Sequence, residues 1–168
     1  MLYIGIDNGV TGTVGAVGEG YYRFALTPVK KEQSYTKAKN IITRVDVNEF
    51  RRLIEDIIEE AGVQRQEVLV IMERPLINPT MFKASMSASR TLEAELGVIE
   101  TLGLGHRYCD SRDWQKVVLP KGTTGTSELK KASLDIASRL YPDYEKEYRK
   151  HKDADGLMIA HWGKEAKL

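Results

Sequence analysis

Three short apolar segments open the chain, and tight turns separate them. The segments are Leu2–Asp7, Thr11–Val17 and Tyr21–Thr27, with Asn8-Gly9 and Gly18-Glu19-Gly20 between them. Asn-Gly is a strong hairpin signal, and short β-branched segments between turns are typical of strands. The pattern predicts an antiparallel meander of three strands.

The hydrophobic period changes after Asp46. Apolar residues recur every three or four positions from Phe50 to Ala61, which predicts an amphipathic helix with Asp46 as its N-cap and Gly62 at its end. Val68–Met72 is apolar throughout, as in a strand that is buried on both faces. We expect this strand to lie parallel to the first one.

The segment between the meander and this helix breaks the pattern. Pro28–Arg44 carries five basic residues and one acid, and we interpret it as a mobile basic loop.

The second half of the chain predicts further helices near 80–102, 127–140 and 154–165, and a short strand at Arg107–Asp110. The order of elements predicts an α/β fold, in which helices cover both faces of a mixed five-stranded sheet. A chain of 168 residues corresponds to one domain, which we place at 1–168.

Composition narrows the class of protein only a little. Lys plus Arg number 25 and Asp plus Glu 24, so a net charge of +1 neither demands nor excludes nucleic acid. The single cysteine, Cys109, cannot form an intrachain disulfide, which fits a reducing compartment such as the cytoplasm. No apolar run is long enough for a membrane span.

Acidic residues lie at the ends of predicted elements. Asp7 ends the first strand, Glu73 ends the buried strand, and Asp153 and Asp155 begin the last helix. Each has an ordinary explanation by itself: a turn residue, an ion pair with Arg74, or a helix cap.

Together, the acids indicate a metal site. If the first and fourth strands are adjacent and parallel, their carboxylates meet at the edge where open sheets place ligands. We expect three or four carboxylates without matching cations, an arrangement that a divalent ion stabilises. Oxygen ligands suit Mg²⁺ or Mn²⁺, and two such ions support phosphoryl displacement.

Three motifs carry a resemblance to a known family. They are Tyr3-Ile-Gly-Ile-Asp-Asn-Gly9, Ile71-Met-Glu-Arg-Pro75 and Asp153-Ala-Asp-Gly-Leu-Met-Ile-Ala160, and Asn78–Ala84 and Asp110–Gln115 add to them. The chain resembles RuvC-like Holliday junction resolvases on the ribonuclease-H-like fold, most of all the short phage-borne branch.

The resemblance implies a homodimeric endonuclease that nicks four-way DNA junctions symmetrically with Mg²⁺, and a bacterial or phage-infected host cytoplasm. It makes Asp7, Glu73 and Asp155 catalytic metal ligands. The family often has a fourth ligand three residues before the last acid, where this chain has Lys152.

Asp153 and His151 are the alternatives for that fourth ligand. Asp153 reaches the same metal as Asp155 only from a non-helical cap, because residues two apart on a helix point about 200° apart. His151 suits Mg²⁺ poorly and would act rather as a proton shuttle. We favour Asp153, and a site of three acids is the remaining alternative.

Basic and aromatic residues near the acids are candidates to contact DNA, because phosphates attract cations and unstacked bases stack on rings. Phe82 lies near the position of the family's wedge residue, although a core aromatic is its more ordinary role. Ordinary surface charges are the alternative for the basic residues, and an ion pair with Glu73 is the alternative for Arg74. The candidates are Arg74, Phe82, Lys83, Arg90, Lys121, Lys130 and Lys131.

Other functions stay open at this point. Ile4–Gly12 also resembles the phosphate loop of actin-like kinases, but those need a second lobe. A non-catalytic DNA-binding member would not need the acids. Another ribonuclease-H-like nuclease, acting on flaps or RNA–DNA hybrids, fits the acids equally well.

Overall fold

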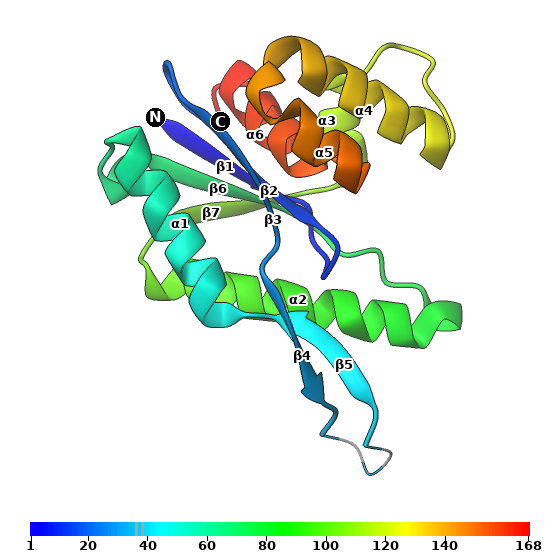
Figure 1. Cartoon of the computed structure of the whole chain (residues 1–168). Helices are drawn as coiled ribbons and strands as arrows, with labels where there is room; N and C mark the ends of the chain where they lie inside the picture. The colour runs from blue at the N-terminus through cyan, green and yellow to red at the C-terminus, as the bar shows by residue number, and fades with distance from the viewer. Residues whose placement is uncertain (36, 38) are drawn as a thin grey trace.

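The computed structural model describes residues 1–35, 37 and 39–168. Its centre is a five-stranded sheet in the order β3-β2-β1-β6-β7 (Figure 1). The first three strands are antiparallel, and β6 and β7 continue the sheet parallel to β1. The strands are β1 (Leu2–Ile6), β2 (Thr13–Val17), β3 (Tyr22–Leu26), β6 (Val68–Glu73) and β7 (Gly105–Cys109).

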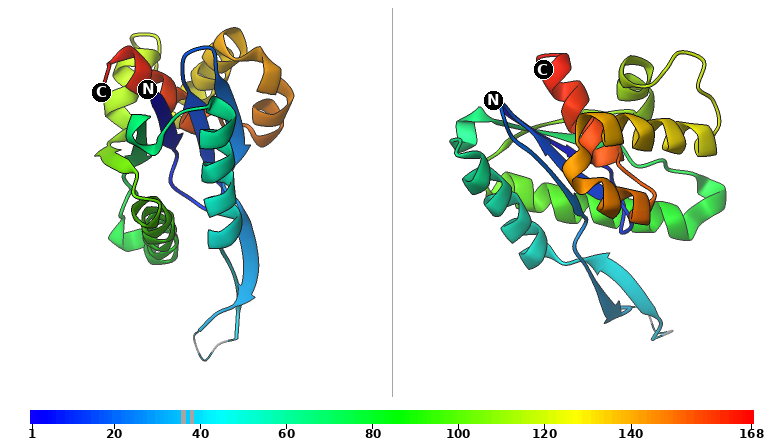
Figure 2. Two further views of the ribbon diagram at one scale, coloured as in Figure 1. Left: turned by 90° about the vertical axis from the view of Figure 1, so that its left-hand side faces the viewer. Right: turned by 45° about the horizontal axis from the view of Figure 1, so that its top comes forward.

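Helices cover both faces of this sheet (Figures 1 and 2), so the predicted fold class is confirmed. One face carries α1 (Val47–Ala61) and α2 (Phe82–Thr101). The other face carries α3 (Ser111–Val118), α4 (Thr126–Leu140), α5 (Glu145–His151) and α6 (Asp155–Glu165). Short 3₁₀ turns lie at Arg65–Glu67, Pro79–Met81 and Pro142–Tyr144. Within the described residues, no helix combines the length and apolarity that crossing a membrane needs.

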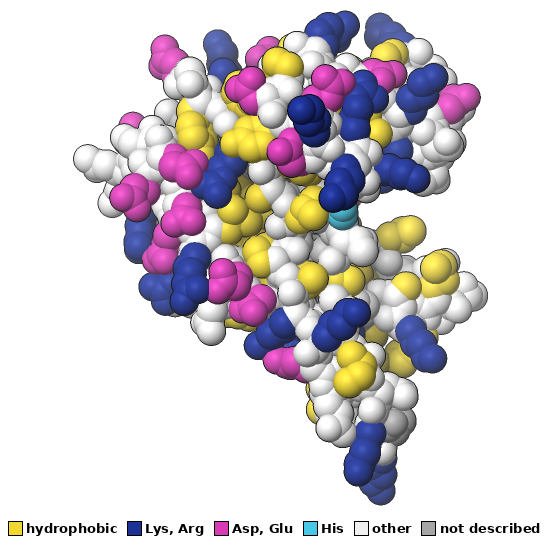
Figure 3. All heavy atoms as spheres, in the orientation of Figure 1, with side chains coloured by type: hydrophobic (Ala, Val, Ile, Leu, Met, Phe, Trp, Pro, Cys, Tyr) yellow, Lys and Arg dark blue, Asp and Glu magenta, His cyan; other side chains and the backbone are white. Residues whose placement is uncertain are grey.

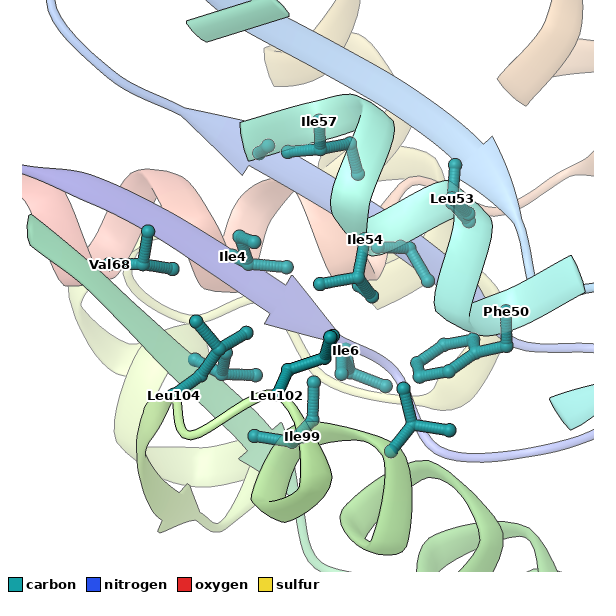
Figure 4. Packing of buried hydrophobic residues seen from close by; sticks show 14 of the residues in the cluster. Ile4, Ile6, Phe50, Leu53, Ile54, Ile57, Val68, Ile99, Leu102 and Leu104 are labelled. Atoms are coloured by element: carbon teal, nitrogen blue, oxygen red, sulfur yellow. The ribbon is translucent and has the colours of Figure 1, made fainter. Parts of the chain in front are cut away.

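Side chains of the central strands point alternately to the two faces of the sheet and contribute to a separate hydrophobic core on each face. Leu2, Ile4 and Ile6 of β1 pack with α1 and α2, as Figure 4 shows for part of this cluster. Tyr3 of β1 and Ile71 of β6 belong to the opposite core, which α3 to α6 cover. Because successive strand residues point to opposite faces, Asp7 and Glu73 continue the row that faces α6.

The predicted boundaries of α1 are confirmed by its caps. The Asp46 side chain accepts a hydrogen bond from the Glu49 N–H at 3.3 Å, as an N-cap does. Gly62 ends the helix in the left-handed conformation, with φ +64°.

The interpretation of Pro28–Arg44 as a mobile loop is wrong. The segment contains β4 (Val29–Gln33), which pairs with β5 (Ile41–Val45) in a separate antiparallel hairpin. Glu32 explains how the basic face is tolerated, because it forms ion pairs with Lys30 at 2.8 Å and Arg44 at 2.7 Å. Positions 36 and 38 of this segment lie outside the described residues.

The approach of α6 to the sheet depends on glycine. A Cβ atom on Gly15 of β2 would lie 2.2 Å from Leu157 Cα, and one on Gly156 would lie 2.4 Å from Thr13 O. No side chain fits at either position without moving a backbone. The start of α6 therefore lies directly on β1 and β2, which brings its acids to the end of β1.

Glu95 is the buried polar residue of α2 that the sequence does not explain. Its side chain is fully buried, and neither carboxylate oxygen has a hydrogen-bond partner among the described residues. Burial raises the pKa of Glu95 well above its ordinary value. The native state therefore favours the protonated acid.

We expect Glu95→Met to stabilise the protein by about 1–3 kcal/mol at pH 8, the cost of a buried unsatisfied polar group. Because the native pKa of Glu95 is raised, the wild type has its full stability below the unfolded pKa of about 4.3, where the acid is protonated in both states. The wild type then loses stability as the pH rises through the native pKa. The gain should therefore be larger at pH 8 than at pH 4. Urea unfolding at both pH values measures it, with the exposed Glu93→Met as control. An equal gain at both pH values would contradict a protonated Glu95.

Candidate metal centre

Asp7 and Glu73 lie side by side at the carboxyl ends of two adjacent strands. β1 and β6 pair in parallel, with Ile6 opposite Met72, so each acid is the next residue along its strand. The Asp7 N–H donates to Thr13 O at 2.9 Å, which extends the β1–β2 ladder through Asp7. Both acids are thus held by regular sheet geometry.

Asp153 and Asp155 come to the same edge from the start of α6. Lys152 ends α5 in the left-handed conformation, with φ 63°, and turns the chain toward the sheet. Asp153 lies before the helix, and its Oδ1 accepts the Asp155 N–H at 2.8 Å. Asp153 reaches this edge from a non-helical position, one residue before the N-cap Ala154, and so meets the condition that helix geometry sets.

A hydroxyl group joins this helix start to the sheet. Thr13 Oγ1 accepts the Gly156 N–H at 3.0 Å and donates to Asp153 Oδ1 at 3.4 Å. Ser133 of α4 donates to Asp155 Oδ1 at 2.7 Å. The two carboxylates are therefore oriented by neighbours from β2 and α4.

Asp7, Asp153 and Asp155 form a group that could hold a metal ion. One carboxylate oxygen of each lies within 4.8 Å of the others. The donor set is entirely oxygen, which fits Mg²⁺ or Mn²⁺. Glu73 is outside this tightest group, and its Oε1 accepts a hydrogen bond from Trp114 Nε1 at 3.4 Å.

A lysine lies among the acids. Lys130 Nζ of α4 donates to Asp155 Oδ2 at 2.7 Å and also contacts Asp153 Oδ2. The expectation that the acids meet without a matching cation is therefore wrong. The physical reason is that α4 packs against α6 and brings its basic residue to the helix start.

Electrostatics show that the cluster is under like-charge repulsion. The pKa of Asp7 is raised well above its ordinary value by burial and then by Asp153, Glu73 and Asp155. Burial and Asp153 also raise the pKa of Asp155, while Lys130 and Ser133 lower it. Burial lowers the pKa of Lys130, but its two aspartate partners outweigh that effect and hold the pKa above its ordinary value. A second cation would relieve the repulsion on Asp7, which Lys130 does not contact by hydrogen bond.

Solved structures share this architecture. Thermus thermophilus RuvC in complex with a Holliday junction substrate matches with a TM-score of 0.60 and 13% identity, covering 99% of this chain and 96% of that chain. Another Thermus thermophilus RuvC structure matches with a TM-score of 0.55 and 15% identity, covering 99% and 97%. No family model matches the sequence. A search of curated proteins finds no significant match.

This chain has the RuvC fold. The predicted resemblance is thereby confirmed at the level of the fold, since both matches cover nearly the whole chain and agree with the mixed sheet. At identities of 13% and 15% the roles of individual residues have to be argued from this structure itself.

The RuvC fold places the predicted DNA-contacting residues in different surroundings. Arg74 pairs with Asp110 at 3.0 Å and not with Glu73. Phe82 is 66% exposed, so the alternative interpretation of Phe82 as a core aromatic is wrong. Arg90 Nη1 donates to Tyr35 Oη at 3.2 Å. The exposed lysines are Lys83, Lys121 and Lys131, whereas Lys130 is the one that contacts the acids.

His151 is adjacent to the site but outside the acidic group. Its Nε2 lies 2.8 Å from Thr11 O, a backbone carbonyl of the loop after Asp7. A ring nitrogen at this distance from a carbonyl donates its proton to it, so that nitrogen is engaged. His151 therefore ties the end of α5 to the loop that carries Asp7.

Sequence reasoning missed Thr13, Ser133 and Trp114 as neighbours of the acids. Trp114 is fully buried, and its side-chain N–H reaches Glu73. Ser133 lies three residues after Lys130, on the same face of α4. This spacing of three is the sequence signal that links Ser133 to Lys130. It does not predict a contact with the acids, because the same spacing is common on any helix.

Proposed function

We propose that this protein is a metal-dependent endodeoxyribonuclease that cuts four-way DNA junctions. The observation that carries the proposal is the convergence of Asp7, Glu73, Asp153 and Asp155 at the carboxyl edge of a sheet with the RuvC fold. Thermus thermophilus RuvC, which shares this fold, is bound to a Holliday junction substrate.

The acids suit the binding of Mg²⁺ or Mn²⁺, and we assign them that role. Asp7, Asp153 and Asp155 hold one ion, and Glu73 extends the ligand set toward a second. Two such ions stabilise both the attacking and the leaving oxygens of an in-line phosphodiester hydrolysis. The sheet and the Gly156 approach keep the four carboxylates in place.

Positioning of the DNA falls to residues around the acids. The surface is hollowed between the upper helices and the right-hand end of α2 (Figure 3), on the side toward which β1 runs. Phe82 is exposed at the beginning of α2, beside further exposed apolar side chains at Ile77 and Met81. Such rings and apolar groups stack on unpaired bases of a branched substrate. Arg74 and Lys83 supply cations for the flanking phosphates.

Paired symmetric nicks require two sites, so we propose a homodimer with twofold symmetry. α2 is the candidate interface, because exposed small residues at its beginning, such as Ala84, allow close approach away from Ser87 and Ser89.

A panel of radiolabelled four-way junctions, flaps, RNA–DNA hybrids and linear duplexes tests the function. We expect Mg²⁺-dependent cutting of the four-way junction at symmetric positions and no cutting in EDTA. Light scattering with and without junction DNA should give the mass of a dimer. Preferred cutting of flaps or hybrids would assign another nuclease activity to the same acids, and binding without cutting would make the chain a binding module.

A further inference from the structure

A groove runs between the β4–β5 hairpin and α2, outside the acidic site. The hairpin begins beside α2 and extends away from the central sheet, across the direction of the helix (Figures 1 and 2). The groove has a volume of about 550 Å³. Tyr35, Thr43 and Arg44 line its hairpin side, and Ser87, Ser89 and Arg90 line its α2 side.

The hairpin carries more basic side chains than its own acid can pair with. Residues 29–45 contain five basic side chains and a single acid, Glu32, which is shared between Lys30 and Arg44. Lys31 is exposed and stands opposite Thr43, a lining residue, so the two side chains lie on the same face of the hairpin. Lys and Arg side chains follow the hairpin to its tip in Figure 3. The hairpin is thus an electropositive arm.

The lining also offers hydrogen-bond donors suited to phosphate. Ser87, Ser89 and Thr43 carry hydroxyl groups, and each wall has one arginine, Arg44 on the hairpin and Arg90 on α2. Tyr35 is 71% exposed, and Arg90 holds its hydroxyl at 3.2 Å. Glu93 is the one acid of the lining. Hydroxyls, guanidinium groups and an exposed ring are the groups that proteins use on nucleic-acid backbones.

One contact links α2 beside the groove to the loop that follows Asp7. Asn8, the neighbour of Asp7, donates from Nδ2 to Ala88 O of α2 at 3.3 Å. Ala88 lies between Ser87 and Ser89, the two serines of the groove. The α2 side of the groove therefore begins next to the loop that follows Asp7.

We propose that this groove binds the sugar-phosphate backbone of a duplex DNA arm that leaves the cleavage site, with the hairpin as its outer wall. The inference rests on the proposed function in naming DNA as the substrate, and it adds where an arm of that substrate lies. Charge complementarity favours DNA over a second copy of this chain, whose net charge is +1 and whose own hairpin is basic.

The test is DNA binding in EDTA, where cleavage does not interfere. We expect the combined variant Lys31→Gln, Lys37→Gln and Arg90→Gln to bind a four-way junction about 10–100-fold more weakly at 0.15 M salt. The slope of log affinity against log salt should fall by about 2–3, because each lost phosphate contact contributes about 0.9. Junctions with shortened arms should reduce the affinity of the wild type more than that of the variant.

The matched control removes the same charge elsewhere. The control variant combines Arg65→Gln, Lys164→Gln and Lys167→Gln, three positions at the opposite end of the sheet. It should bind the junction like the wild type. Circular dichroism and thermal unfolding of both variants confirm that each is folded.

A second measurement locates the arm directly. Cys109 is buried, and burial raises the pKa of its thiol to about 12, so it does not compete for thiol reagents. Lys37→Cys carrying a photo-crosslinker should crosslink to an arm of the junction and not to its centre.

Two outcomes would overturn the proposal. One is equal affinity and salt slope for the groove variant and its control, with no crosslink to an arm. The other is conversion of a dimer to a monomer by the groove variant, which would make the groove a subunit interface. Failure of the proposed function can be distinguished from failure of the groove proposal. In that case the wild type would bind DNA in this assay but would not cut any junction.

Discussion

Asp7→Asn should abolish junction cleavage and leave junction binding in EDTA unchanged or slightly stronger. The substitution keeps the shape of the side chain and removes one of the three clustered charges. Because loss of groups behind a metal ligand already costs about 10–100-fold, loss of a ligand should cost more than about 100-fold. Single-turnover cleavage rates over a Mg²⁺ series measure the effect.

The same variant makes a separate prediction for stability. Burial and three acidic neighbours raise the pKa of Asp7, so its charge is unfavourable in the native state without metal. Asp7→Asn should therefore melt at a higher temperature than wild type in EDTA and gain less from added Mg²⁺. Asp56→Asn, an exposed acid of α1, is the control and should behave like wild type in both assays. Near wild-type turnover of Asp7→Asn would remove Asp7 from the catalytic site.

Lys130→Met should destabilise the protein in EDTA and do so much less in saturating Mg²⁺. Without metal, Lys130 is the hydrogen-bonded cation of Asp153 and Asp155, whose side chains are 11% exposed. Removing one partner of a buried ion pair costs up to several kcal/mol, and the partial exposure of Lys130 reduces this to about 2 kcal/mol. For a chain of this size, that is a fall of about 4–8 °C in Tm.

The metal dependence separates a charge role from a packing role. If Lys130 and the metal ion neutralise the same carboxylates, bound Mg²⁺ should restore most of the lost stability, and the variant should show a larger Mg²⁺-induced rise in Tm. Lys131→Met, the exposed neighbour, should show neither effect. An equal loss of Tm with and without Mg²⁺ would mean that Lys130 only packs. Differential scanning calorimetry across a Mg²⁺ titration decides between them.

Local patterns were sufficient to predict most of the fold. They were also sufficient to place three of the four acids, those at the ends of strands or at the start of a helix. Asp7 and Glu73 could be placed because each ends a short apolar strand, and parallel strands bring such ends to one edge. Asp155 could be placed because a helix begins there. The hairpin was missed because its basic residues concealed the β-branched run from Ile41 to Val45.

The sequence by itself determined the period of each element, the alternation that turns Asp7 and Glu73 toward α6, and the oxygen chemistry of the site. These properties depend on residues close in the chain. Only the tertiary structure decided that Lys130 and Ser133 of α4 would meet Asp155, because that contact joins residues more than 20 positions apart through the packing of α4 on α6. It likewise decided that Gly15 would face the backbone of α6 and Gly156 the backbone of Thr13, since no local pattern distinguishes a glycine at a close approach from one in a turn.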